Sequence, residues 1–175
     1  MKVCIIGNNL TSLVLAKALV KKEIFVDIFY KNKKTYINKT RTLGISKSNI
    51  DYFNKNISNI SKILWPIKKI KIYSENSGDD EIIKFEDEKN NLFSIIKNEK
   101  IFEQLNKELK KNGFFSLKKD TGYKNFNKSD YDLFINCDLK HELTKKFFFK
   151  KLEKNYNSTA LTTIIDHENL TSNNT

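Results

Sequence analysis

The sequence predicts an α/β fold that opens with a parallel β-sheet, and residues 1–30 carry that prediction. The run Lys2–Ile6 is short and apolar, as expected of a buried parallel strand. Residues Leu10–Lys22 place apolar side chains at helical spacing. A β-branched and aromatic run, Ile24–Tyr30, follows. Strand, turn, helix and strand in this order indicate a βαβ unit, whose parallel crossover is almost always right-handed.

The middle of the chain predicts an antiparallel excursion from that sheet. After a polar loop at residues 31–40, Ser46 is placed to cap a helix that runs to about Asn56. A second short helix is expected from Ser58 to Leu64, ended by Pro66. Residues 67–97 then predict a small antiparallel meander of three strands: Ile67–Ser74, Glu81–Glu86 and Leu92–Lys97.

The chain is then expected to return to the parallel sheet. Asn98 is a good N-cap for a helix through Lys111, and Asn112-Gly113 is a C-terminal stop. For Leu143–Leu152, a helix and a loop packed on the core both stay open. Three later segments predict strands: Phe114–Leu117, Tyr131–Cys137 and Ser158–Asp166. The whole is expected to be a Rossmann-like sheet with an inserted β excursion.

The net charge of +11 does not by itself indicate a nucleic-acid partner. The chain is rich in Lys, Asn and Ile, which a genome biased towards A and T would produce. Arg41 is the only arginine, whereas a protein that reads DNA bases needs several for bidentate contacts. The scattered lysines are best explained as a solvated surface, with a membrane-facing patch as the alternative.

The cysteines and histidines do not predict a metal site. Cys4, Cys137, His141 and His167 are too few for zinc with its usual ligand spacing. Both cysteines lie in apolar strands, which predicts small buried side chains in a reducing cytoplasm. No apolar run reaches the roughly 20 residues of a membrane-spanning helix. We therefore expect a cytoplasmic protein, with peripheral contact to a membrane left open.

The turn between the first strand and the first helix is where a dinucleotide would bind. Gly7, Asn9 and Ser12 stand at the three glycine positions of G-x-G-x-x-G. Gly7 serves the tight turn and Ser12 is still small. The Asn9 side chain obstructs phosphate, although asparagine tolerates a left-handed backbone. The second strand ends at Tyr30 rather than at an acidic residue, and Asp27 is expected on a sheet face. A βαβ unit that no longer binds nucleotide stays open as an alternative.

Several segments, taken in order, resemble one family. Arg41-Thr42-Leu43-Gly44-Ile45-Ser46 is similar to Arg-x-x-Ala-Leu-Ser, and Tyr131–Asp138 to Tyr-Asp-Leu-Leu-Ile-Gly-Ala-Asp. The other matching segments are Val3–Gly7 with Ala16–Leu19, Leu64–Ile70, Leu92–Leu105 and Tyr156–Thr175. Their order and spacing resemble the N-terminal half of the flavin-dependent aromatic hydroxylases of ubiquinone biosynthesis, within the para-hydroxybenzoate hydroxylase superfamily.

This resemblance implies a cofactor, a substrate and two further site residues. FAD would lie across the βαβ turn, with Arg41 reaching the cofactor and Asp138 beside its adenosine and pyrophosphate. NAD(P)H or another reductant would supply electrons, and O2 would hydroxylate a polyprenylated phenol. A complex of quinone-biosynthesis proteins is the partner that the resemblance leaves open. Because the flavin carries such chemistry, we assign no catalytic acid or base. The sequence departs from the pattern at four more positions: Asn136, Leu139, Glu142 and Lys145.

These observations support more than one interpretation of the function of this chain. The first is a fragment or divergent member of the flavin monooxygenases, in which residues 1–175 form an incomplete FAD-binding domain. Residues 67–97 and 156–170 would then contribute strands to a partial substrate-domain sheet. The second is a degenerate Rossmann-like binding or structural module without catalytic activity. An NAD-dependent enzyme lacks support because the acidic residue after the second strand is missing.

Overall fold

The structure is a computed structural model that describes residues 1–31, 40–74, 80–87, 91–120, 122, 128–148, 150 and 152–159. The chain divides into two compact units. The first combines Met1–Ile37 with Ile101–Leu161, and the second combines Asn38–Lys100 with Thr162–Thr175. The candidate site is built mainly in the first unit.

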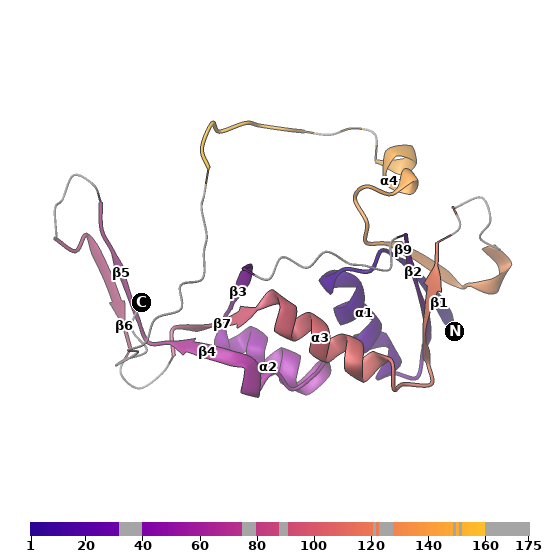
Figure 1. The fold of residues 1–175 in the computed structure, drawn as a ribbon, viewed down its shortest axis with the longest axis horizontal. Coiled ribbons are helices and arrows are strands. Elements are labelled where there is room, and N and C mark those ends of the chain that lie inside the picture. The colour runs from indigo at the N-terminus through magenta and orange to yellow at the C-terminus, as the bar shows by residue number, and fades with distance from the viewer. Residues whose placement is uncertain are drawn as a thin grey trace. The chain divides into compact units, whose positions relative to one another are not determined.

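Four parallel strands form the sheet of the first unit, in the order β8-β2-β1-β9. Figure 1 shows the labelled strands β1, β2 and β9 grouped near the N-terminus. Their bounds are β1 Lys2–Ile6, β2 Phe25–Tyr30, β8 Phe115–Lys119 and β9 Leu133–Asn136. Ile5 of β1 is in register with Ile28 of β2 and with Ile135 of β9. The predicted strand–helix–strand start is confirmed, and β9 rejoins the parallel sheet as expected.

Helix α1 (Leu10–Val20) connects β1 to β2, and α3 (Asn98–Leu109) leads into β8. Lys17 of α1 forms an ion pair with Glu108 of α3 at 2.8 Å, so the two helices lie side by side. Their apolar faces are buried with alternate residues of the strands. The fully buried side chains of this core are Val3, Ile5, Leu13, Ala16, Ile28, Leu105 and Leu109. Burial of these aliphatic groups supplies the main driving force for the unit.

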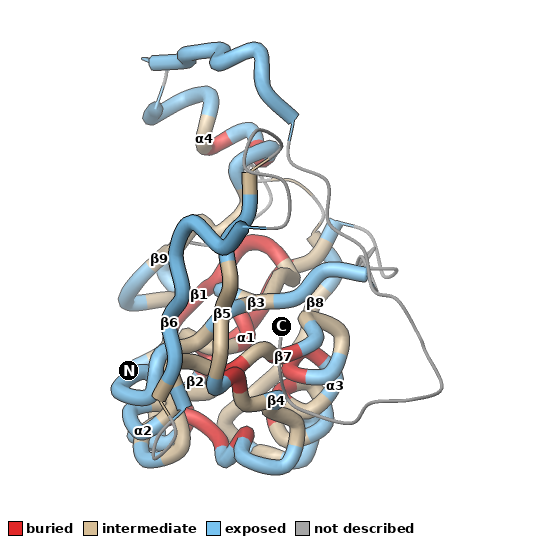
Figure 2. Tube along the Cα trace, turned by 90° about the vertical axis from the view of Figure 1, so that its left-hand side faces the viewer, coloured by how far each residue is buried: buried red, intermediate tan, exposed pale blue. Residues whose placement is uncertain are grey.

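A smaller apolar cluster occupies a sheet face defined by the other strand residues. Cys4 and Ile6 alternate with Val3 and Ile5, and they pack with Phe29 and with Leu143 of α4 (Glu142–Phe147). Tyr131 and Phe134 border this cluster. Apart from Leu143 and Thr144, the residues of α4 are exposed, as Figure 2 shows. Of the segment Leu143–Leu152, residues up to Phe147 therefore belong to the short helix α4, whereas Phe148, Lys150 and Leu152 are not helical.

The second unit carries the antiparallel part of the fold. Its three-stranded sheet has the order β3-β7-β4, and a separate pair joins β5 to β6. The bounds are β3 Thr42–Ile45, β4 Leu64–Ile67, β5 Lys69–Ile72, β6 Ile83–Glu86 and β7 Phe93–Lys97. Helix α2 (Lys47–Asn56) begins after Ser46, whose hydroxyl accepts a hydrogen bond from the Asn49 N–H at 3.4 Å. The predicted cap and helix are thus confirmed.

The expected meander of residues 67–97 is confirmed only in part. β5 pairs with β6, but β7 pairs with β3 and β4 instead of β6. The predicted strand Ile67–Ser74 is divided at Lys68 between two sheets. β3 was not expected from the sequence, because its four residues include Gly44 and show weak alternation.

The predicted helix from Ser58 to Leu64 was wrong in its length. Only a 3₁₀ turn forms at Ser61–Ile63, and the strand β4 begins at Leu64. Pro66 lies inside this strand rather than ending a helix. An edge strand accepts proline because its outer N–H needs no partner, and β4 is at the edge of its sheet.

The C-terminal prediction is mostly untested. Of the expected strand Ser158–Asp166, the described residues are Ser158 and Thr159, and they are not in a strand. The same holds for the start of the substrate-domain segment 156–170. Residues 160–175 lie outside the described residues.

Candidate functional site

The candidate site lies at the carboxyl ends of the parallel strands, where open α/β sheets bind ligands. Gly7 follows β1 with φ of +102°, a conformation that disfavours any side chain. A Cβ at this position would lie 3.0 Å from the Asp138 Cβ and 3.2 Å from its backbone nitrogen. The Gly7 N–H donates to the Phe29 carbonyl at 2.8 Å. Glycine is therefore required both by the turn and by the close approach of the chain after β9.

The side chain of Asn9 caps the N-terminus of α1. Its Oδ1 accepts hydrogen bonds from the Ser12 N–H at 3.0 Å and from the Ser12 hydroxyl at 3.2 Å. Its Nδ2 donates to the Cys137 carbonyl at 2.6 Å, which ties the helix to the end of β9. The backbone of Asn9 is extended, with φ −123° and ψ 178°. Asparagine is thus explained by capping, and the expected use of its left-handed tolerance was wrong.

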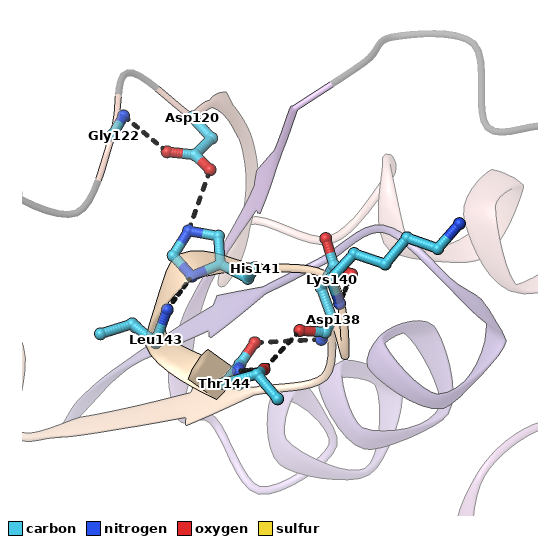
Figure 3. A network of polar contacts seen from close by, with 8 residues as sticks. Asp120, Gly122, Asp138, Lys140, His141, Leu143 and Thr144 are labelled. Carbon is cyan, nitrogen blue, oxygen red and sulfur yellow. Dashed lines mark hydrogen bonds and ion pairs between the residues drawn. The ribbon is translucent and has the colours of Figure 1, made fainter. Parts of the chain in front are cut away.

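Asp138 lies in a second turn, between β9 and α4 (Figure 3). Its Oδ1 accepts from the Lys140 N–H at 2.9 Å, while its carbonyl accepts from the Thr144 hydroxyl at 2.9 Å. Asn136 completes the arrangement by donating through Nδ2 to the Thr144 hydroxyl at 2.7 Å and accepting from the Asp138 N–H at 3.0 Å. These bonds fix the turn that approaches Gly7. Four of the five expected site residues, Gly7, Asn9, Ser12 and Asp138, are therefore brought together.

Sequence reasoning missed a buried pair, His141 and Asp120, at the same edge (Figure 3). His141 Nε2 lies 3.3 Å from Asp120 Oδ2, and both side chains are almost fully buried. His141 Nδ1 accepts from the Leu143 N–H at 3.2 Å and so caps α4. Because Nδ1 accepts this hydrogen bond, Nε2 is the ring nitrogen that faces the Asp120 carboxylate. Asp120 also accepts from the Gly122 N–H at 2.8 Å.

A pocket of about 500 Å³ opens beside this pair. Lys31, which follows β2, and Lys119, at the end of β8, line it together with Asp120, Gly122, His141 and Glu142. The pocket therefore presents both cations and carboxylates at the ends of two neighbouring strands. The sequence contained one indication of this pocket, because Asp120 directly follows an apolar strand.

Arg41 is not placed at the βαβ turn by the structure, because it belongs to the second unit. It is exposed, and its carbonyl accepts a hydrogen bond from the Asn98 N–H at 3.0 Å. Tyr30 ends β2 as expected, so the last residue of this strand is not acidic. Its carbonyl accepts from the Asp120 N–H at 2.9 Å.

Asp27 lies in the middle of β2, on a sheet face, as predicted. Its carboxylate accepts hydrogen bonds from Lys118 Nζ at 2.8 Å and from the Tyr131 hydroxyl at 2.7 Å, with Lys2 Nζ at 3.4 Å. Burial alone would raise the pKa of Asp27, but these hydrogen bonds and the two lysine charges lower the pKa below its ordinary value. Asp27 therefore holds the sheet together rather than contacting a ligand at the edge.

Cys4 has the environment expected of a small buried side chain in a strand, whereas Cys137 is only partly buried and directly follows β9. Burial raises the pKa of Cys4 to about 12, and burial also raises the pKa of Cys137. Both are free thiols. Within the described ranges, no three His, Cys, Asp or Glu side chains are grouped so that they could hold a metal ion. Among the helices of the described residues, none is both long and apolar enough to cross a membrane.

Comparison with known proteins identifies the fold. No protein-family model matches the sequence, and no curated protein matches it either. Solved structures do match: FqzB has a TM-score of 0.55 at 13% identity over 68% of this chain. Klebsiella pneumoniae HpxO, solved with FAD and uric acid, has a TM-score of 0.53 at 13% identity over 67% of this chain. Pseudomonas putida p-nitrophenol 4-monooxygenase PnpA has 0.53 at 11% identity over 67%.

The matches cover only part of these proteins. The chain spans 28% of FqzB, 30% of HpxO and 31% of PnpA. Sequence identities this low establish a shared fold and nothing more. Over about two thirds of its length, the chain has the α/β fold found in part of the flavin-dependent monooxygenases.

Proposed function

We propose that this chain is the FAD-binding part of a flavin-dependent monooxygenase that hydroxylates a polyprenylated phenol in ubiquinone biosynthesis. The β1–α1 turn carries the proposal. It joins a glycine at φ +102° to a helix N-terminus at the carboxyl edge of a parallel sheet. The N–H groups and the helix dipole at such a turn attract the pyrophosphate of a dinucleotide.

The residues at the turn fit a pyrophosphate, with one adjustment. Gly7 adds no side chain, and the first N–H groups of α1 point out of the helix without intrahelical partners. The Ser12 N–H is engaged by Asn9 and becomes available only when the Asn9 side chain turns away. In this proposal Gly7, Asn9, Ser12 and Asp138 hold the pyrophosphate region, and Arg41 reaches the cofactor, as the family resemblance implies.

FAD, when bound, supplies the oxygen chemistry, with NAD(P)H or another reductant as electron donor. The residues of this chain bind and orient the cofactor and exclude water from it. Support for FAD comes from HpxO and CtdE, both crystallised with FAD. Support for an aromatic substrate comes from p-nitrophenol 4-monooxygenase. The polyprenylated phenol, and an association with quinone-biosynthesis proteins, are supported by the sequence segments from Arg41–Ser46 to Tyr131–Asp138.

The proposal extends to domain organisation. Residues 1–175 act as an incomplete FAD-binding domain, and residues 67–97 and 156–170 contribute strands to a substrate-domain sheet. Antiparallel pairing of β5 with β6, and of β7 with its two neighbours, supports the first of these two segments.

A second function is favoured by one specific observation. The Asn9 side chain already accepts the Ser12 N–H at the helix N-terminus and bridges the helix to the end of β9. With Tyr30 in place of an acidic residue, this closed turn also suits a degenerate Rossmann-like module without catalytic activity. The two functions differ in whether FAD reaches the turn.

Titration of the purified chain with FAD, followed by quenching of flavin fluorescence, separates them. We expect the unaltered chain to bind FAD and Asn9→Gly to bind about tenfold more tightly, because glycine releases the Ser12 N–H for phosphate. Asn59→Gly is the matched control. Like Asn9, Asn59 accepts an N–H at the start of a helix through its Oδ1, here the N–H of Ser61. Asn59 lies in the second unit.

Failure of both the unaltered chain and Asn9→Gly to bind FAD, while both remain folded by circular dichroism, would reject the flavin proposal in favour of the module. For the finer proposal, the FAD-loaded chain is incubated with NAD(P)H, O2 and a short-chain prenylated phenol. Mass spectrometry should detect one added oxygen atom. Binding of FAD without this product would restrict the function to cofactor binding.

A further inference from the structure

Helix α4 and the residues after it expose large apolar side chains among lysines. We call this the α4 patch and define it by Lys145, Lys146, Phe147, Phe148, Lys150 and Leu152. Phe147 is 59% exposed, Phe148 is 73% exposed and Leu152 is fully exposed. Figure 2 shows most of α4 and the described residues that follow it as exposed. Water contact with so much apolar surface is unfavourable and indicates that something covers it.

An apolar pocket of about 630 Å³ adjoins the two phenylalanines. Ile6, Phe134, Ile135 and Leu143 line it with Phe147 and Phe148. The polar side chain in its lining, Asn136, is already engaged by Thr144 and by the Asp138 N–H. The pocket therefore offers apolar contact without a polar group that would select a specific ligand.

The charge around the patch is positive. Residues 142–154 contain five lysines against two glutamates, Glu142 and Glu153. Lys145 and Lys150 are exposed, and Lys146 Nζ lies 5.4 Å from the centre of the Phe147 ring. Cationic groups at the edge of exposed aromatic rings allow the rings to enter an apolar layer while the charges meet anions at its surface.

We propose that the α4 patch binds the surface of an anionic lipid bilayer. Phenylalanine and leucine between lysines are typical of segments that lie in the membrane interface. Anionic headgroups attract such lysines within a Debye length. A protein partner fits less well. Interface cores are enriched in aromatic residues, phenylalanine included, but they are depleted of lysine, and three of the six patch residues are lysines. This inference does not depend on whether the chain binds FAD.

Co-sedimentation of the full chain with vesicles tests the proposal. We expect binding to equimolar phosphatidylglycerol and phosphatidylcholine, weakening as salt rises, and little binding to phosphatidylcholine alone. Phe147→Ser with Phe148→Ser should lower the partition coefficient at least about tenfold. Lys145→Gln with Lys150→Gln should lower it about twentyfold. Leu152→Ser should also lower it, and because Leu152 is fully exposed this variant cannot act through the core.

Tyr52→Ser and Lys62→Gln are matched controls, since both residues are exposed on the second unit, and each should bind vesicles as the unaltered chain does. The proposal is overturned if the unaltered chain ignores anionic vesicles or binds both vesicle types equally. It is also overturned if the Phe147, Phe148 and Leu152 variants all bind normally. Sedimentation velocity gives a further check: a dimer dispersed by the phenylalanine substitutions would identify the patch as an interface between copies of this chain.

Discussion

Two turns meet at the carboxyl edge of the parallel sheet, and each uses a helix cap to make a second connection. In the β1–α1 turn, Asn9 accepts from the Ser12 N–H and donates to the Cys137 carbonyl after β9. In the β9–α4 turn, His141 accepts from the Leu143 N–H and contacts Asp120 after β8. The first cap thus ties α1 to β9, and the second ties α4 to the far edge strand of the sheet.

The difference between the two turns lies in what each connection leaves exposed to a ligand. Asn9 acts on the helix terminus itself, where a phosphate would bind. His141 and Asp120 face each other at the wall of a pocket that Lys31 and Lys119 also line. The Asn9 side chain therefore competes with a ligand for the first turn. The His141–Asp120 pair at the second turn instead forms part of the wall of a pocket.

Gly7→Ala should break the first turn and produce the largest effect. Alanine at φ +102° is strained, and its Cβ would lie 3.0 Å from the Asp138 Cβ, so the second turn must shift as well. We expect a loss of about 3 kcal/mol in the free energy of unfolding, measured by urea denaturation. Gly113→Ala is the control, because nothing lies within 4 Å of its added Cβ. Equal losses in the two variants would show that the turns do not touch.

His141 provides the next largest effect and separates its two roles. His141→Ala removes the cap of α4 and leaves the buried Asp120 without its ring partner, so we expect a loss of about 2 kcal/mol. His141→Asn keeps a capping acceptor but is too short to reach Asp120, and it should lose about half as much. Urea denaturation measures the loss, and hydrogen exchange at the Leu143 amide reports the cap. If the asparagine variant matches alanine, the cap contributes little.

The two turns also differ in how far the sequence predicts them. Gly7, the first strand and the first helix follow from local periodicity, and the register of β1 with β2 confirms them. The His141–Asp120 pair joins residues 21 positions apart that follow non-neighbouring strands, and no local pattern marks such a contact. The prediction for the antiparallel strands of residues 67–97 was partly wrong for the same reason. Pairing of β7 with β3 and β4 depends on long-range contacts, whereas the sequence favoured neighbouring segments.

The prediction for Asn9 was also incomplete, because the G-x-G-x-x-G pattern considers only whether a side chain obstructs phosphate. The structure adds a positive role, since the side chain supplies both an acceptor and a donor. For Asp138, the predicted position beside the β1–α1 turn agrees with its close approach to Gly7. Its Oδ1, however, accepts a hydrogen bond from the Lys140 N–H within the β9–α4 turn. The ligand role of both residues stays a prediction.

The smallest effect is expected from Asn9, and it tests whether the first cap matters as a bridge. Asn9→Ala should lose about 1 kcal/mol in urea denaturation, because the Ser12 N–H loses its acceptor. Asn9→Asp keeps that acceptor and adds a charge that the helix N-terminus favours, but it turns an acceptor towards the Cys137 carbonyl. We expect Asn9→Asp to be no more stable than Asn9→Ala for this reason. An aspartate variant as stable as the unaltered chain would show that the 2.6 Å contact to Cys137 contributes nothing, and that α1 needs a cap but no connection to β9.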